Sequence, residues 1–362
     1  MIDVDHVELY VGNAKQAAYY YAAAFGFNIT AYKGLETGCR THASYLLEQG
    51  NIRLVLTTAL TPDHPACKHV SLYGDGVKDI AFCVKDALAA YEATTSRGGN
   101  GAMEPSEAED RYGTIRQSAI HTYGEVWHSF VDRSEYKGKF FPGFEPIDPP
   151  VNRINREGDC GLRFLDHAVG NVEEGKMNEW VRWYEEVMGF SMFKHFDDAD
   201  ISTEYSALMS KVMSSGRGII KFPINEPAPG KKKSQIQEYL DWHNGMPGVQ
   251  HLAFRTDDGI NSVGELRRRG VEFLHLPDTY YEIIWDRVGE IKEDRAKVKE
   301  LGILVDRDDK GYLLQIFTKP IEDRPTLFFE IITRRGSESF GKGNFKALFE
   351  SLELEQERRG NL

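Results

Sequence analysis

The sequence predicts an α+β fold of two related domains, each built as a doubled β-α-β-β-β unit. Two observations predict it: motifs of the first half recur in the second, and each half runs through strand, helix and several strands twice. Such a unit forms a curved, barrel-like, mostly antiparallel sheet whose concave face can hold a ligand or a metal. We place the domains at residues 1–140 and 161–362, with a linker at 141–160 and a helix at the end of the chain.

The repeat begins with the first strand of each domain. Asp5-His6 near the start corresponds to Asp166-His167 after the midpoint, and an aromatic-rich helical stretch follows each pair. Each helical stretch ends at a glycine, Gly26 or Gly189, which suits a left-handed helix cap leading into a strand. A later strand matches as well, since 77–82 resembles 249–254. A repeat of this kind indicates two related domains.

The remaining elements are the linker and the C-terminal helix. Segment 141–150 is rich in proline and glycine, which is typical of a linker. Apolar residues at i, i+3, i+4 and i+7 predict an amphipathic helix near the end of the chain; they are Phe345, Leu348, Phe349 and Leu352. This helix either packs against the sheet or acts as a lid that excludes water from a substrate. Arg358 and Arg359 after it are expected to be solvated.

Composition excludes several classes of protein. Of the 362 residues, 41% are hydrophobic, and apolar runs fall short of the ~18 residues of a membrane-spanning helix. The formal charge of −12 argues against nucleic-acid binding. The N-terminus lacks the features of a signal peptide, and the four cysteines are scattered as in reduced cytosolic proteins. We therefore expect a cytoplasmic protein without a membrane span or a structural zinc site.

The most informative residue is Glu330, which interrupts the apolar strand 328–332. An unpaired buried carboxylate costs several kcal/mol, so this one must be neutralised, paired or bound to a metal. His167 and His251 stand in similarly apolar strands. Two histidines and one carboxylate on buried strands indicate a facial triad for a metal. In the first half Asp79 replaces the second histidine and 126–131 contains no carboxylate, so we expect only the second half to bind metal, with a degenerate site around His128 left open.

Two alternatives compete with this interpretation. A single histidine on a strand is usually a hydrogen-bonded core residue, and Glu330 could pair with Arg324, Arg334 or Arg335. The placement of all three polar residues at corresponding points of a doubled motif favours the metal. Two imidazoles and a carboxylate suit Fe(II), while Mn(II), Co(II), Ni(II) and Zn(II) are possible, and hydrolysis at zinc needs only one open position.

Six segments of the second half resemble the 4-hydroxyphenylpyruvate dioxygenase family, which has the vicinal-oxygen-chelate fold. They are 222–227, 233–237, 248–251, 301–308, 311–318 and 340–345. The resemblance extends over essentially the whole chain, and the first half matches in organisation more than in motif. It implies that the two predicted domains are vicinal-oxygen-chelate domains and that His167, His251 and Glu330 are ligands of Fe(II).

The resemblance also implies a substrate site. Its predicted members are Ser206, Asn225 and Gln250 at the phenol or ring, Gln235 and Gln315 near the keto acid and iron, and Phe317 and Phe345 on the two faces of the ring. Gln315 and Phe345 are predicted to be catalytic, and Asn344, Phe345, Leu348 and Phe349 to form the lid. Strand alternation places Gln315 and Phe317 on one face, although Gln315 could instead satisfy a sheet edge and Asn225 could be a turn residue.

The implied reaction converts 4-hydroxyphenylpyruvate and O₂ to homogentisate and CO₂, by oxidative decarboxylation, ring hydroxylation and side-chain migration, in the catabolism of tyrosine and phenylalanine. We expect a homo-oligomer, a dimer or a tetramer. A 4-hydroxymandelate synthase would share substrate and ligands, but Pro223 and Phe345 favour the dioxygenase. An extradiol dioxygenase and a non-enzymatic binding protein of the same fold remain alternatives, and the complete triad argues against the binding protein.

Overall fold

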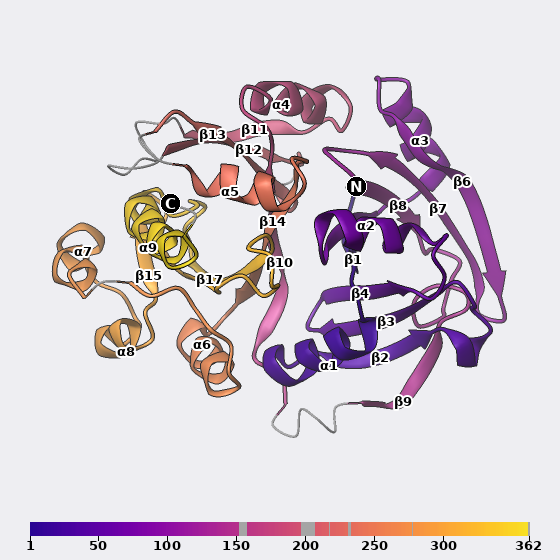
Figure 1. Ribbon diagram of the computed structural model, residues 1–362, viewed down its shortest axis with the longest axis horizontal. Coiled ribbons are helices and arrows are strands. Elements are labelled where there is room, and N and C mark those ends of the chain that lie inside the picture. Colours follow the sequence, from indigo (N-terminus) through magenta and orange to yellow (C-terminus); the bar gives the residue numbers. More distant parts are fainter. Residues whose placement is uncertain (152–157, 197–206, 217, 231–232, 277, 361–362) are drawn as a thin grey trace.

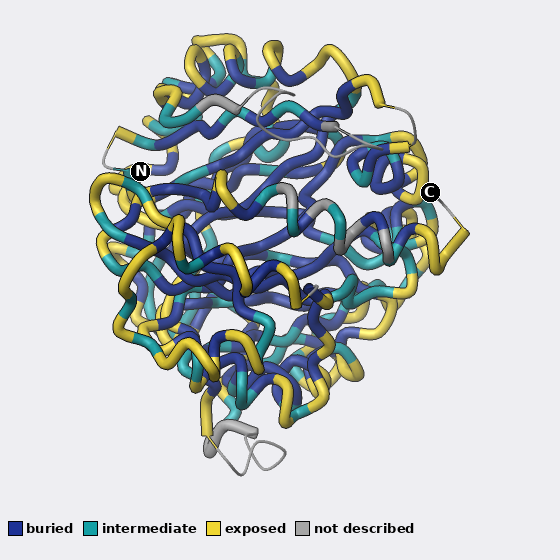
Figure 2. Tube along the Cα trace, turned by 90° about the vertical axis from the view of Figure 1, so that its left-hand side faces the viewer, coloured by how far each residue is buried: buried dark blue, intermediate teal, exposed yellow. Residues whose placement is uncertain are grey.

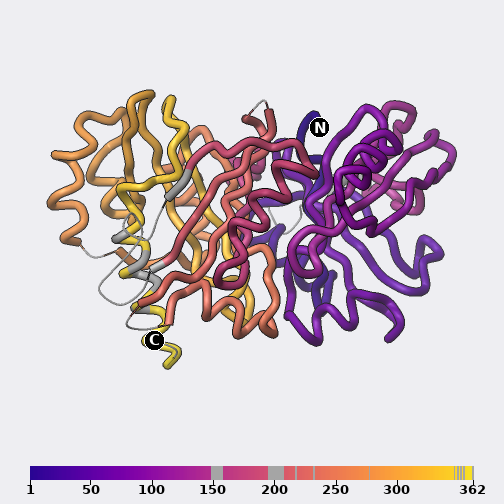
Figure 3. The backbone as a smooth tube through the Cα atoms, turned by 90° about the horizontal axis from the view of Figure 1, so that it is seen from above, coloured from indigo at the N-terminus to yellow at the C-terminus, as the bar shows by residue number. Residues whose placement is uncertain are grey.

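Two curved sheets, one from each half of the chain, lie side by side in the computed structural model (Figure 1). The structure describes residues 1–151, 158–196, 207–216, 218–230, 233–276 and 278–360. Seen from above, the first half is separate from the last strands, and residues just after the midpoint lie between them (Figure 3).

The first sheet has nine strands in the order β6-β7-β8-β5-β1-β4-β3-β2-β9. They are β1 (Asp3–Tyr10), β2 (Asn28–Lys33), β3 (His42–Gln49), β4 (Ile52–Ala59), β5 (Gly76–Cys83), β6 (Gly101–Asp110), β7 (Gly113–His121), β8 (Trp127–Asp132) and β9 (Glu145–Val151). The last of these lies inside the predicted linker and pairs with β2, so part of that segment extends the first sheet.

The second sheet has eight strands in the order β11-β12-β13-β10-β14-β17-β16-β15. They are β10 (Leu162–Asn171), β11 (Ser191–Phe196), β12 (Ala207–Ser214), β13 (Lys221–Ala228), β14 (Gly248–Thr256), β15 (Leu304–Arg307), β16 (Tyr312–Phe317) and β17 (Phe328–Arg335). Apart from β9, the two strand orders are the same when read in opposite directions, with β1 matching β10 and β5 matching β14.

The repeat predicted from the sequence is confirmed by this topology. Each sheet is antiparallel except for two pairs, β1·β4 and β5·β8 in the first and the matching β10·β13 and β14·β17 in the second. Gly26 and Gly189 have φ of 77° and 69°, the left-handed backbone expected after each aromatic helix.

The helices lie around the two sheets. They are α1 (Ala14–Phe25), α2 (Pro65–Tyr73), α3 (Ala87–Thr95), α4 (Met177–Glu186), α5 (Gln235–Trp242), α6 (Gly259–Arg268), α7 (Tyr280–Val288), α8 (Arg295–Glu300) and α9 (Phe345–Arg358), with short 3-10 turns η1 (Leu35–Thr37) and η2 (Lys342–Asn344). Buried strands occupy the middle of the molecule, and most exposed turns lie outside them (Figure 2). Among the described residues, none of the helices combines the length and apolar character that a membrane span needs.

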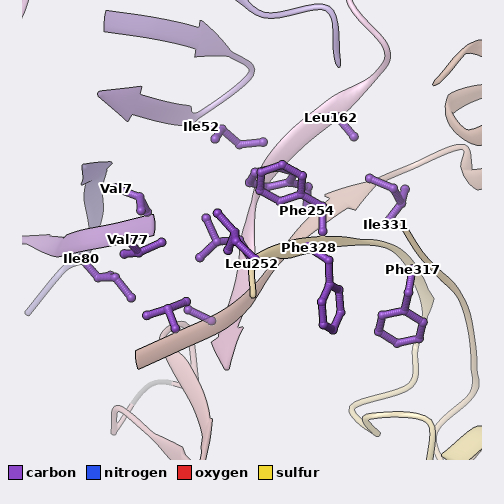
Figure 4. Close-up of a cluster of buried hydrophobic side chains, with 14 of the residues drawn as sticks. Val7, Ile52, Val77, Ile80, Leu162, Leu252, Phe254, Phe317, Phe328 and Ile331 are labelled. Carbon is purple, nitrogen blue, oxygen red and sulfur yellow. The ribbon is translucent and has the colours of Figure 1, made fainter. Parts of the chain in front are cut away.

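One hydrophobic core continues through both halves. Val7 and Ile80 of the first sheet belong to the same cluster as Leu252 and Phe254 of the second (Figure 4). Phe254 is fully buried, and burying a phenylalanine stabilises a fold by about 1.5–3 kcal/mol. The sheet that carries the triad is therefore supported from behind by the first half.

Candidate metal centre

Three neighbouring strands place His167, His251 and Glu330 on one face of the second sheet. In the strand register, His167 of β10 and Glu330 of β17 both stand beside Ala253 of β14, one on each side. His251 lies two residues before Ala253 and therefore points to the same face. The small Ala253 side chain leaves space above it, so the two outer side chains can meet over the central strand.

The three side chains converge within metal-binding distance. The Oε2 atom of Glu330 lies 3.1 Å from Nε2 of His167 and 3.4 Å from Nε2 of His251. The residues are 2%, 4% and 8% exposed, respectively. Within the described part of the chain, this is the one group of three His, Cys, Asp or Glu side chains close enough to share an ion.

Glu330 and the two histidines shift one another's pKa values. Burial alone would raise the pKa of Glu330, but the two imidazoles lower it, to about 2. Burial lowers the pKa of His251, whereas at His167 the effect of burial is outweighed by Glu330 and Asp166, which raise its pKa. The Oε1 atom of Glu330 is buried and has no hydrogen-bond partner. An ionised, half-satisfied carboxylate facing two imidazoles is what a divalent cation would complete.

The arginines considered as partners for Glu330 form other interactions. Arg334 pairs with Asp166, with Nη2 2.7 Å from Oδ2. Arg335 pairs with Glu293, and Arg324 donates to the backbone carbonyl of Leu72. The alternative in which an arginine neutralises Glu330 directly is therefore not realised in the structure.

Both histidines are held by side chains that precede them in the sequence. Nδ1 of His167 lies 2.9 Å from Oδ2 of Asp166, and Nδ1 of His251 lies 2.9 Å from Oε1 of Gln250. Because both acceptors occupy Nδ1, each ring presents Nε2 to Glu330. Sequence reasoning assigned Gln250 to the substrate and did not identify a role for Asp166.

A cavity opens directly onto the triad. Besides the triad it is lined by Val169, Leu208, Ser210, Val212, Pro223, Asn225, Gln235, Gln250, Phe317, Phe328, Phe340, Phe345 and Leu348. A mainly apolar wall with a few amides suits a ligand that has a ring and polar ends.

Five predicted substrate residues line this cavity: Asn225, Gln235, Gln250, Phe317 and Phe345. Ser210 and Leu208 of β12 also line it, and no pattern in the sequence indicated them. Ser206 lies outside the described residues.

Gln315 lies in β16 and is not among the cavity-lining residues. Both atoms of its amide are buried without a hydrogen-bond partner. A Cβ added at Gly341 would stand 2.2 Å from Nε2 of Gln315. Glycine at 341 therefore lets the backbone that leads to α9 pass close to this amide.

The C-terminal helix covers the cavity, since Phe345 and Leu348 of α9 line it. The turn before this helix is held at Asn344, whose Oδ1 accepts a hydrogen bond from Tyr280. Phe349 belongs to α9, but its side chain lies outside the described part of the structure. This placement supports the lid interpretation.

Arg359 is exposed, as expected after α9, but it also forms an ion pair that the sequence did not indicate. Its guanidinium donates two hydrogen bonds to the Glu238 carboxylate, with distances of 3.1 and 2.8 Å. Glu238 belongs to α5, which lies beside α9 (Figure 1). The partner was invisible in the sequence because it lies on another helix.

The first half places different residues at the positions of the triad. The registers of the two sheets match His6 with His167, Asp79 with His251, and Ser129 with Glu330. His128 is turned away from these positions, because its Nε2 atom lies 2.8 Å from the hydroxyl of Tyr184 in α4. A serine at the carboxylate position leaves the first half without the third ligand.

A duplicated curved sheet with a His₂Glu group on its concave face defines a class of metal-dependent proteins. A model of the Glyoxalase/Bleomycin resistance protein/Dioxygenase superfamily matches residues 3–134 and 164–316.

More closely related proteins narrow this class. The 4-hydroxyphenylpyruvate dioxygenase of Tetrahymena thermophila is 49% identical over 371 residues, covering 99% of this chain and 91% of the relative. That of Dictyostelium discoideum is 48% identical over 366 residues, covering 99% of both chains. A solved variant of 4-hydroxymandelate synthase from Streptomyces coelicolor is 30% identical, with a TM-score of 0.86 over 98% of this chain and 99% of that one. The chain belongs to the 4-hydroxyphenylpyruvate dioxygenase family.

Proposed function

We propose that this protein is an Fe(II)-dependent enzyme that converts 4-hydroxyphenylpyruvate and O₂ to homogentisate and CO₂. The observation that carries the proposal is the buried His₂Glu group opening onto a mainly apolar cavity that α9 borders. Its near-full-length relatives bear the name of this activity. The proposed ligands are His167, His251 and Glu330.

The residues present fit a ferrous ion. Two imidazole nitrogens and one carboxylate oxygen face a common point, and Oε1 of Glu330 has no hydrogen-bond partner. These three residues would hold the ion, and the cavity beside them would admit the substrate. When bound, iron would supply the redox chemistry by holding the keto acid and O₂ and by oxidising the substrate.

The protein's contribution is to orient the substrate and exclude water. Phe317 packs edge-on to His251, with ring centroids 5.9 Å apart, and Phe345 enters from α9 on the side that closes the cavity. Between them these two rings are proposed to fix the plane of the substrate's phenol. Asn225, Gln235 and Gln250 offer amides to its polar ends.

Closure by α9 keeps this space dry. Leu348 and Phe345 line the cavity on the side of α9, and the pair between Arg359 and Glu238 connects the end of this helix to α5. A dry cavity protects a reactive oxidant from side reactions with water. The substrate carries its own α-keto acid, so no second organic substrate is required.

Oxidation at the benzylic carbon, giving 4-hydroxymandelate, is the second candidate, favoured by the structural likeness to the synthase. Pro223 and Phe345 both line the cavity and occupy space that the ring would otherwise use. We propose that they hold the ring where its substituted carbon is attacked, which favours homogentisate.

The test is anaerobic loading with Fe(II), addition of 4-hydroxyphenylpyruvate, and then oxygen, with products separated by chromatography. Homogentisate supports the proposal, and 4-hydroxymandelate supports the second candidate. Absence of oxygen uptake by the loaded wild type would contradict both. Glu330→Gln treated in the same way is the matched control for adventitious iron.

A further inference from the structure

A unit of arginine, aspartate and histidine occurs twice, once in each half of the chain. In the second half, Asp166 lies 2.9 Å from Nδ1 of His167 and receives two hydrogen bonds from Arg334, at 2.8 and 2.7 Å. The side chains of Arg334 and Asp166 are 6% and 2% exposed. We call Asp166, His167 and Arg334 the second clasp.

The first clasp consists of Asp5, His6 and Arg133 and has the same geometry. Asp5 lies 2.7 Å from Nδ1 of His6, and Arg133 donates to both carboxylate oxygens, at 2.6 and 2.8 Å.

Even the neighbouring aromatic ring is repeated. Phe140 meets His6 edge-on at 4.9 Å, and Phe340 meets His167 edge-on at 5.1 Å. Each arginine also donates to a backbone carbonyl next to or at that phenylalanine, Arg133 to Phe140 and Arg334 to Ser339. Both clasps therefore connect the first strand of a half, β1 or β10, to the end of β8 or β17 and the segment that follows it.

Among the described residues, only the second clasp has a group of three possible metal ligands in front of it. Nε2 of His167 faces Glu330 and His251, whereas the matching positions in the first half hold Ser129 and Asp79. Substitutions in the first clasp consequently measure the contribution of this arrangement to the stability of the fold, without any contribution to metal binding.

The chemistry of the second clasp favours metal binding. A carboxylate engaged by an arginine is an acceptor, so Nδ1 of His167 must be the donor in their hydrogen bond. The ring then directs Nε2 toward the metal site and cannot turn without breaking this bond. Such partners of ligating histidines typically contribute about 10–100-fold to metal affinity.

We propose that Asp166 and Arg334 are positioning residues that set the metal affinity of His167, whereas Asp5 and Arg133 serve the fold alone. The inference rests on the metal site of the proposed function but not on its reaction. It also connects the centre to the lid, because Arg334 holds the carbonyls of Ser337 and Ser339 just before the segment that leads to α9.

The experiment compares Asp166→Asn with Asp5→Asn in the full chain. Affinity for Co(II) and Zn(II) is measured by competition with a fluorescent chelator, and urea unfolding of the metal-free proteins measures stability. Asp166→Asn should bind each metal about 10–100-fold more weakly, and Asp5→Asn should bind as the wild type does. Both variants should lose stability in the metal-free state.

Arg334→Lys and Arg133→Lys form a second pair that keeps the buried charges, in case Asp166→Asn does not fold. A lysine cannot hold both carboxylate oxygens, so metal affinity should fall in Arg334→Lys and not in Arg133→Lys. Unchanged affinity in the variants of the second clasp, or an equal loss in those of the first, would overturn the inference. A wild type that binds metal without turnover would refute the proposed reaction and leave this inference standing.

Discussion

His128 provides the clearest test of the electrostatics of the interface between the two halves. Its Nδ1 donates to the carbonyl of Ile80 at 3.1 Å, and its Nε2 accepts from the hydroxyl of Tyr184 at 2.8 Å. The ring is completely buried, and burial lowers its pKa from the ordinary 6.5 to about 4. The folded protein therefore keeps this histidine neutral at pH values where an unfolded chain would protonate it.

The sign and size of the effect follow from proton linkage. Between pH 6.5 and about 4 the unfolded state binds a proton that the folded state does not, so the free energy of unfolding falls as the pH falls. A difference of about 2.5 pKa units at ~1.36 kcal/mol each gives about 3 kcal/mol lost across that window. His128→Gln removes this contribution, at the cost of about 1–2 kcal/mol at neutral pH for an altered buried hydrogen bond.

The assay is urea unfolding of the metal-free protein between about pH 7 and pH 4.5, a range that spans most of the window. Fluorescence of Trp183 reports locally, because its ring lies 6.4 Å from that of His128. Tyr184→Phe is the matched control, since it removes a hydrogen bond while leaving the titrating ring in place. If His128→Gln loses stability on acidification as steeply as the wild type, the reasoning is refuted.

Three further substitutions test the site. Glu330→Gln should abolish Fe(II) binding and turnover while the far-ultraviolet circular dichroism stays native; normal iron content would contradict the ligand assignment. Arg359→Ala removes the pair with Glu238, and because the Arg359 side chain is 28% exposed we expect a stability loss below about 1 kcal/mol. We also expect a clear rise in KM and faster hydrogen exchange in α9. Unchanged exchange would show that this pair does not hold α9 in place. Phe345→Ile should divert part of the product to 4-hydroxymandelate, and homogentisate as the exclusive product would count against ring positioning by Phe345.

The triad was predictable because a repeated strand pattern constrains which side chains can meet. Glu330 in an apolar run demanded compensation, and the repeat identified His167 and His251 as residues of equivalent strands. The structure shows why they converge: His167 and Glu330 are paired with Ala253 from opposite sides of the central strand β14. Alternation along a strand fixes the face, and the order of strands fixes the partners.

Residues that act through distant contacts were not predictable. Arg334 was one of three arginines near Glu330 in the sequence, and nothing there indicated Asp166, 168 positions away, as its partner. Arg359 is exposed as expected, but its pair with Glu238 was not predicted, because a helix pattern does not show which neighbouring helix supplies a carboxylate. The pairing of β9 with β2 escaped prediction for the same reason, since proline and glycine in its surroundings are typical of linkers.

The first half shows how the same scaffold tolerates buried charge without a metal. Glu8 and Asp79 stand directly opposite each other in its sheet, and burial raises the pKa of both. Glu8 accepts a hydrogen bond from Thr57 at 2.6 Å, and Asp79 accepts one from the backbone of Ser129 at 3.0 Å. Hydrogen bonds thus satisfy these carboxyl groups and burial favours their neutral form, whereas Glu330 stays ionised between two imidazoles and keeps one oxygen free. Buried acids occur in both halves, so the capacity to bind metal depends on which neighbour each carboxylate meets, an imidazole nitrogen or a hydrogen-bond donor.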